Sequence, residues 1–184
     1  IIKKVLGKVK LQSCGIEFEY SYELYEAHID EINKLNTKFL KHLKCYSLDI
    51  NSSYSASARI VDVFLDLRGM RNLEMLTLNF ADCNFLLPNK TQNTENSLFY
   101  LKALRYLDIN MSGGIYSHRE NNGLSIFKAL RTANQLETLK LNLEGLPLSG
   151  LEFETLFCSW HERKSLKRLE LNLRTTLLTE KIII

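Results

Sequence analysis

The sequence predicts an α/β solenoid, in which parallel strands stack into one sheet and helices cover only one face of it. A seven-residue phrase ending in asparagine occurs five times, and apolar and polar residues alternate within each copy. Between the copies, apolar residues instead recur at the three- and four-residue steps of a helix. A unit repeated in this way packs mainly on its neighbours, so we expect a single domain over residues 1–184.

The five copies are regularly spaced, and their final asparagines recur with a period of about 30 residues, which is typical of a solenoid. A looser copy, LGKVKLQ, opens the chain at positions 6–12. The step from its final residue, Gln12, to Asn51 is longer than any of the others, which predicts an insertion in the first unit. The five copies are CYSLDIN (45–51), LEMLTLN (73–79), LRYLDIN (104–110), LETLKLN (136–142) and LKRLELN (166–172).

Each copy predicts a half-buried strand, because a period of two places alternate side chains on opposite faces. Leu78, Ile109 and Leu141 are expected to be almost completely buried and stacked from one unit to the next. The full apolar set expected on the core side is Leu48, Ile50, Leu76, Leu78, Phe80, Leu107, Ile109, Met111, Leu139, Leu141, Leu143, Leu169, Leu171 and Leu173.

The segments between the copies predict helices, because their apolar residues form one stripe at helical spacing. The segment 151–160 follows Ser149-Gly150, and it leads into the run Cys158-Ser159-Trp160-His161. A nucleophile–base reading of that run is disfavoured, since consecutive helical residues point in different directions; Cys158 is expected in the core and His161 at the helix end. Helices are expected within residues 22–43, 58–67, 98–104, 124–130 and 151–160.

The phrase LxxLxL followed by a helix resembles a leucine-rich repeat, and the period is similar to that of the ribonuclease-inhibitor-like subclass. The opening copy resembles the family most, with Cys14 where the family has Asn or Cys, followed by Ile16. The resemblance implies a horseshoe of about six repeats with a parallel concave sheet and convex helices. It also implies protein binding on the concave side. The later copies depart from the family at Ser53, Ala81, Ser112, Glu144 and Arg174.

Positions three, five and seven of each phrase are expected to share the exposed face of the sheet. Position three reads Lys8, Ser47, Met75, Tyr106, Thr138 and Arg168, and Met75 and Tyr106 are the neighbours most typical of a contact surface. Position seven forms an amide column, which either binds a partner or satisfies itself and the strand ends. The candidate partner-binding residues are Met75, Tyr106, Arg168, Asn79, Asn110 and Asn142.

The sequence contains no catalytic, phosphate-binding or metal-binding motif that we recognise, so we expect a protein without enzymatic activity, cofactor or metal. The four histidines and four cysteines lack metal-ligand spacing. Position five places Asp108 and Glu170 on the exposed face, but Lys140 lies between them, which disfavours an acid–base dyad.

Composition favours a protein partner over nucleic acid or membrane. The net charge is only +3, from 24 basic and 21 acidic residues, and no basic stripe interleaved with aromatic residues is visible. No apolar run approaches the ~20 residues of a membrane span. The widely spaced cysteines indicate free thiols in a reducing compartment, so we expect an intracellular, cytoplasmic protein.

We therefore expect a non-catalytic protein–protein interaction scaffold that uses its concave face. One alternative is a structural subunit of a large multi-protein assembly, bound through its edges. Another, by fold analogy alone, is a regulator of a GTPase or a ubiquitin-ligase adaptor. The chain opens at Ile1 and closes on three isoleucines, Ile182 to Ile184, without a polar cap. We expect it to be a fragment of a longer chain, or to have this end covered by another chain.

Overall fold

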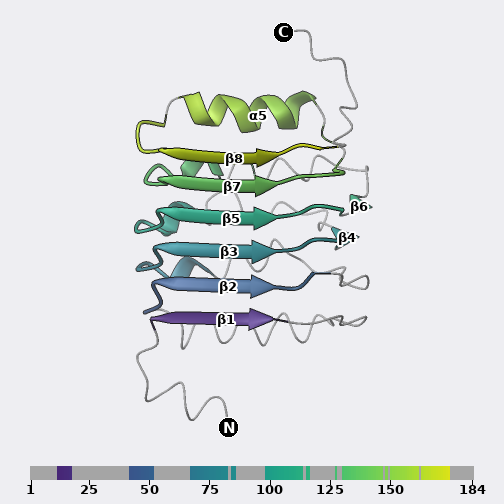
Figure 1. The fold of residues 1–184 in the computed structure, drawn as a ribbon. Helices are drawn as coiled ribbons and strands as arrows, with labels where there is room; N and C mark the ends of the chain where they lie inside the picture. The colour runs from purple at the N-terminus through teal and green to yellow at the C-terminus, as the bar shows by residue number, and fades with distance from the viewer. Residues whose placement is uncertain are drawn as a thin grey trace.

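A computed structural model describes residues 12–17, 42–51, 67–82, 84–85, 98–113, 115–116, 127, 130–146, 148, 150–161 and 163–174. Six strands form one all-parallel sheet whose spatial order follows the chain (Figure 1). The parallel pairing predicted for the five phrases is confirmed, and the sheet is compatible with an α/β fold. The strands are β1 (Ser13–Glu17), β2 (Cys45–Asp49), β3 (Met75–Asn79), β5 (Tyr106–Asn110), β7 (Thr138–Asn142) and β8 (Arg168–Asn172).

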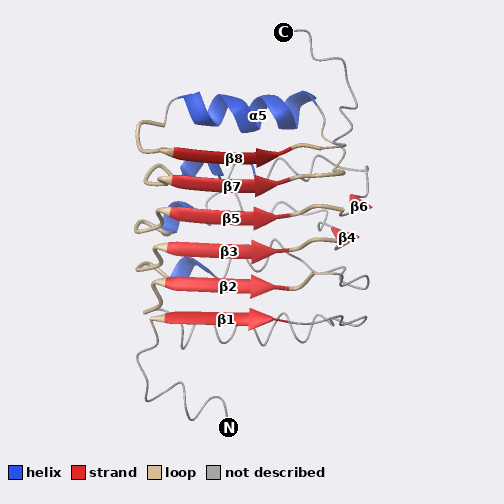
Figure 2. Cartoon of the chain, viewed as in Figure 1, coloured by secondary structure: helices blue, strands red, loops and turns tan. Residues whose placement is uncertain are grey.

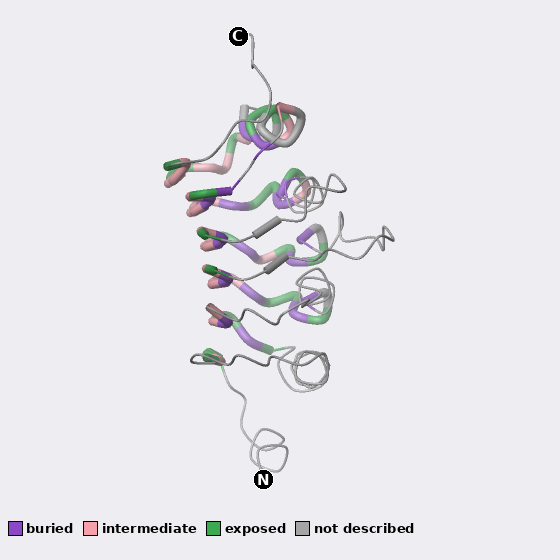
Figure 3. The backbone as a smooth tube through the Cα atoms, turned by 90° about the vertical axis from the view of Figure 1, so that its right-hand side faces the viewer, coloured by how far each residue is buried: buried purple, intermediate pink, exposed green. Residues whose placement is uncertain are grey.

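The described helical segments lie on one side of this sheet, and the opposite side carries none of them (Figures 2 and 3). They are α5 (Gly150–His161), two 3₁₀ turns, η1 (Leu67–Gly69) and η3 (Leu98–Tyr100), and the helical residues 127 and 130–132. The short strands β4 (Asn84–Phe85) and β6 (Ile115–Tyr116) form a separate parallel pair.

The predicted helices are confirmed only in part. The helix expected at 151–160 is α5, but the segment expected at 98–104 begins with η3 and continues as a turn. Leu98, Leu101 and Leu104 explain the difference, because all three are buried and the step of three residues matches a 3₁₀ turn. Of 124–130, residues 127 and 130 are described, both helical. The helices expected at 22–43 and 58–67 lie outside the described residues except at their last positions.

The register of the sheet is uniform across all six strands. The first residues of the strands occupy equivalent positions, and they follow one another at a nearly constant step of about 30 residues. These residues are Ser13, Cys45, Met75, Tyr106, Thr138 and Arg168.

This register corrects the prediction for the first strand. The strand that pairs with β2 is Ser13–Glu17, and not the segment at positions 6–12. Cys14 lies opposite Tyr46 and Ile16 opposite Leu48, so both belong to the core-facing row and Cys14 is not a turn residue. The predicted insertion in the first unit is also wrong, because the step from β1 to β2 is as long as the step from β5 to β7.

The phase assigned to the copy at 45–51 is also wrong, by two residues. Asp49 lies opposite Asn79, whereas Asn51 belongs to the turn after β2. A shift of two residues keeps every side chain on its own face, because side chains alternate with period two. For this reason Leu48 and Ile50 are fully buried as predicted.

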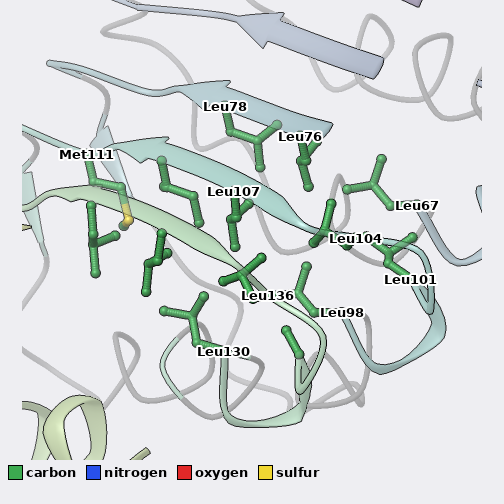
Figure 4. Packing of buried hydrophobic residues seen from close by; sticks show 14 of the residues in the cluster. Leu67, Leu76, Leu78, Leu98, Leu101, Leu104, Leu107, Met111, Leu130 and Leu136 are labelled. Atoms are coloured by element: carbon green, nitrogen blue, oxygen red, sulfur yellow. The ribbon is translucent and has the colours of Figure 1, made fainter. Parts of the chain in front are cut away.

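The core lies between the sheet and the helical side, and leucine dominates it (Figure 4). Leu78, Ile109 and Leu141 are 0%, 0% and 2% exposed, which confirms the prediction for these three side chains. In β8 the same core-facing row is less covered, since Leu169 is 42% exposed and Leu171 is only partly buried. Among the described residues, no strand pairs with the outer side of β8.

The turns that follow β3, β5 and β7 share one backbone feature. Three residues after each strand, Asp82, Gly113 and Gly145 have positive φ angles of 56°, 68° and 77°. Each also donates its N–H to the corresponding turn of the next unit. At Gly113 the space is restricted as well, because a Cβ atom would overlap Oδ1 of Asp82. Glycine satisfies both demands at this position.

Candidate binding face of the sheet

The face opposite the core forms the candidate site, and we call it the polar face. It consists of the first, third and fifth side chains of each main strand, which are half-buried or exposed. These residues are Ser13, Gly15, Glu17, Cys45, Ser47, Asp49, Met75, Thr77, Asn79, Tyr106, Asp108, Asn110, Thr138, Lys140, Asn142, Arg168, Glu170 and Asn172.

The structure brings Met75 and Tyr106 together on this face, as the sequence predicted, since they are register partners on β3 and β5. Met75 is 43% exposed, which makes it one of the few large apolar side chains on the described surface. The hydroxyl of Tyr106 donates to Oδ2 of Asp108 at 3.1 Å. Burial, reinforced by Asp108, raises the pKa of Tyr106, so the phenol stays a protonated donor at neutral pH.

Arg168 lies farther along the face, with Thr138 between it and Tyr106. Its Nη2 lies 2.5 Å from Oε1 of Glu170, and Nζ of Lys140 lies 3.1 Å from Oε2 of the same carboxylate. The hydrogen bond from Lys140 is the main cause that lowers the pKa of Glu170. Glu170 is therefore ionised at neutral pH and holds two cations, which makes it a weak proton acceptor.

Lys140 and Glu170 take part in lining a shallow pocket on β5, β7 and β8. Its volume is about 270 Å³. Ligand sites that enclose a small molecule typically occupy about 300–1,000 Å³, so an open hollow of this size suits a side chain projecting from a partner surface. The lining residues are Asp108, Lys140, Leu141, Asn142, Glu170, Leu171 and Asn172.

The asparagine column ends the strands. Oδ1 of Asn79 accepts the N–H of Ala81 at 3.2 Å, two residues farther along the chain. This is the Asx-turn geometry, in which a side chain replaces a backbone acceptor. Asp49 has the same role in β2, where its Oδ1 accepts the N–H of Asn51. The same bond recurs in Asn110–Ser112, Asn142–Glu144 and Asn172–Arg174.

The amide nitrogens separate the column into two groups. Nδ2 of Asn79 donates to Oδ2 of Asp49 at 2.9 Å, and Nδ2 of Asn172 donates to Oε2 of Glu144 at 3.0 Å. Within the described part of the chain, Nδ2 of Asn110 and of Asn142 has no such acceptor. Of the three predicted asparagines, Asn110 and Asn142 thus keep a donor for a partner, whereas Asn79 is occupied on both sides.

A second arrangement, which the sequence reasoning missed, lies directly before the strands. We call it the charge ladder: Nζ of Lys44 lies 2.9 Å from Oε1 of Glu74, and Nζ of Lys167 lies 2.7 Å from Oε2 of Glu137. Arg105 also pairs with Glu137. Lys167 and Arg105 together lower the pKa of Glu137. The signs alternate strictly from strand to strand, a pattern that aligning the residue before each strand would have revealed.

The cysteines and acidic groups show no clustered chemistry in the described segments. Cys14, Cys45 and Cys158 are free thiols, and no group of three or more His, Cys, Asp or Glu side chains in those segments is placed to hold a metal. Cys158 is exposed, which contradicts the prediction of a core position. Among the α5 side chains whose burial is described, Leu156 and Trp160 are buried, and a residue two steps from each points away from them. His161 ends α5 as predicted.

No family model, curated protein or solved structure matches this chain. Within the described ranges, no helix has the length and apolar character needed to cross a membrane.

Proposed function

We propose that the chain is a leucine-rich repeat solenoid of about six units, with the polar face as the concave side of a horseshoe. Three observations support this architecture: strand order follows the chain, the register is uniform from strand to strand, and the described helical segments lie on one side. An α/β unit of about 30 residues, repeated with constant register, is typical of the ribonuclease-inhibitor-like subclass.

In this proposal the function is non-catalytic: the polar face is a scaffold that binds a protein partner. The observation that carries it is the pairing of exposed Met75 with Tyr106, on a face where the neighbouring strands supply charged side chains of both signs. Tyrosine and arginine are enriched among residues that dominate interface energetics, and methionine adapts to irregular partner surfaces.

The face is also preorganised, which favours binding because fewer groups must be ordered on association. Tyr106 is held by Asp108, and Arg168 by Glu170. Met75 and Tyr106 would form the apolar anchor, Arg168 a charged contact at the rim, and Asn110 and Asn142 hydrogen-bond donors. Asn79 would act only in the fold, because Asp49 already accepts its amide hydrogen.

The test compares two double variants in affinity capture followed by mass spectrometry. Tyr106→Ala with Arg168→Ala removes both anchors, whereas Tyr100→Ala with Arg71→Ala removes the same residue types from exposed positions off the polar face. A protein retained by the native chain and the control, but lost by the first variant, supports the proposal. Equal retention by both folded variants would move the interface away from the polar face.

The free thiols support an intracellular, reducing compartment as part of the same proposal. A second candidate function, a structural subunit of a larger assembly bound through an edge, is favoured by the exposure of Leu169 on β8. Leu169 belongs to the core-facing row but remains exposed, and contacts between subunits often cover apolar surface of this kind.

A further inference from the structure

The outer edge of β8 is built differently from the other strands. Leu169 is 42% exposed, whereas its register partner Leu139 on β7 is 0% exposed. Phe157, on α5, is also 37% exposed. Among the described residues no strand pairs with the outer side of β8, so its backbone groups on that side have no ladder partner there.

The charges on β5, β7 and β8 repeat with alternating sign. β7 carries Glu137 before its first residue and Lys140 at its centre. Its neighbours carry the opposite signs at the same two places: Arg105 and Asp108 on β5, Lys167 and Glu170 on β8. β8 therefore presents to its outer side the same charge pattern that β5 presents to β7, with a basic residue before the strand and an acidic residue at its centre.

We propose that this outer edge binds an extended segment of a partner protein, which runs parallel to β8 and has the charge pattern of β7. The segment carries an acidic residue beside Lys167, a basic residue beside Glu170, and apolar residues beside Leu169 and Leu171. This site shares Glu170 with the polar face, but it lies at the strand edge, and it extends the second candidate function rather than the binding proposed for the polar face.

The backbone supplies the first argument. The carbonyl before each of the strands β1, β2, β3, β5 and β7 accepts two N–H groups at the start of the next strand. For β7, Glu137 O accepts from Lys167 N at 2.8 Å and from Arg168 N at 3.0 Å. The carbonyl of Lys167 occupies the equivalent place on β8. An added parallel strand would complete this pattern, which is the usual basis of peptide recognition at a sheet edge.

The charge ladder supplies the second argument. Glu137 lies between two basic side chains, Arg105 and Lys167, and its side chain is only 26% exposed. Lys167 has an acidic neighbour on one side only, in the described part of the chain, and its side chain is 73% exposed. An acidic residue on the added strand would give Lys167 the environment that Glu137 already has, with opposite sign.

A second copy of this chain fits the edge less well. Its other edge strand in the described sheet, β1, places Gln12 and Gly15 at the two charge-bearing positions. Neither side chain complements Lys167 or Glu170. Charge therefore favours a different protein over a second copy as the occupant, and alternating apolar residues add to the selection.

The probe is a fluorescent peptide that copies β7, QLETLKLNL (residues 135–143), measured by anisotropy against the full 184-residue chain. Its matched control, QLKTLKLNL, replaces the acidic residue with lysine. Cross-strand charge pairs are worth roughly 0.2–1 kcal/mol each, so exchanging attraction for repulsion should weaken binding about fivefold. Lys167→Glu should reverse the preference, and Lys167→Gln should bind both peptides alike.

Lys164→Glu is the control on the protein, since it makes the same charge change in the exposed turn before β8 and should leave the preference unchanged. Circular dichroism establishes that each variant is folded. Binding of both peptides with equal affinity, or absence of binding at millimolar peptide, would overturn the proposal. So would self-association of the native chain that Lys167→Glu abolishes, because the edge would then take a second copy.

Discussion

Asn79 and Asp49 are joined across β2 and β3 by a hydrogen bond of 2.9 Å from Nδ2 to Oδ2. The other end of the same amide accepts the N–H of Ala81. One side chain therefore ends its own strand and ties it to the preceding unit. Asn142 has the first role only, since its Oδ1 accepts the N–H of Glu144 and no neighbouring carboxylate accepts its Nδ2 in the described residues.

This difference predicts unequal effects of the same substitution. Asn79→Asp keeps the turn acceptor but places a second carboxylate against Asp49, so we expect a loss of about 1–3 kcal/mol in unfolding free energy. Asn142→Asp also keeps the turn acceptor, but the new carboxylate does not replace a hydrogen bond to another carboxylate. This substitution should therefore lower the unfolding free energy by less than about 1 kcal/mol. Urea unfolding at pH 7 measures both. Equal losses would show that the Asn79–Asp49 bond contributes nothing specific.

The stacked core predicts a large effect of truncation at β5. Ile109 is fully buried, so Ile109→Ala should lower the unfolding free energy by ~2–5 kcal/mol. Leu169→Ala is the control, because Leu169 is partly exposed and should lose less than half as much. Equilibrium denaturation of both variants tests this. A loss under ~1 kcal/mol for Ile109→Ala would contradict its place in the core.

The charge ladder predicts acid sensitivity. The pKa of Glu137 is lower in the folded chain than the ordinary value of 4.5, so its contribution to stability is present above that value. It is lost as pH falls through the lower folded pKa. The urea midpoint of the native chain should therefore drop between pH 6 and pH 3. Lys167→Gln should reduce that drop, and an identical pH dependence in this variant would rule out the Lys167–Glu137 pair as a source.

Thiol reactivity should follow exposure. Cys158 is exposed on α5, whereas Cys14 is half-buried and burial raises the pKa of its thiol. Because the thiolate is the reactive form, Cys158 should react with a maleimide faster than Cys14 at pH 8. Mass spectrometry of peptides after timed labelling separates the two sites. Faster labelling of Cys14 would place its side chain in a more open environment than β1 provides.

The sheet, its parallel pairing and most of its core could be predicted from the sequence, because alternation of apolar and polar residues fixes the face of each side chain. Alternation does not fix register. A shift of the copy at 45–51 by two residues keeps Leu48 on the buried face. Alternation alone therefore allows Asn79 to be aligned with either Asn51 or Asp49. The backbone ladder decides in favour of Asp49.

The candidate site was less predictable for the same reason. The proximity of Met75 and Tyr106 could be predicted, because the alignment of their two copies matches the register of β3 and β5. The charge ladder joins residues a whole unit apart in the sequence. Its members from Glu74 to Lys167 stand at position two of the aligned copies, whereas Lys44 joins them only once the register of β2 is known. Whether the amide nitrogen of an asparagine has an acceptor, as in Asn79 and Asn172, or has none among the described residues, as in Asn110 and Asn142, depends on local geometry that residue identity does not encode.

The left-handed turns have a consequence for how such a chain can be recombined. Gly113 is favoured at its turn because its φ is positive and because the carboxylate of Asp82, one unit earlier, occupies the space that a Cβ would need. Gly145 has the same φ requirement, but a Cβ there would meet only the backbone of Gly113 at ordinary contact distance. Residues at equivalent positions of neighbouring turns therefore restrict each other, as Asp82 and Gly113 do. A chimaera that places a residue with a side chain at position 113 would force the Asp82 carboxylate to rotate away and would also strain the backbone at a φ of 68°.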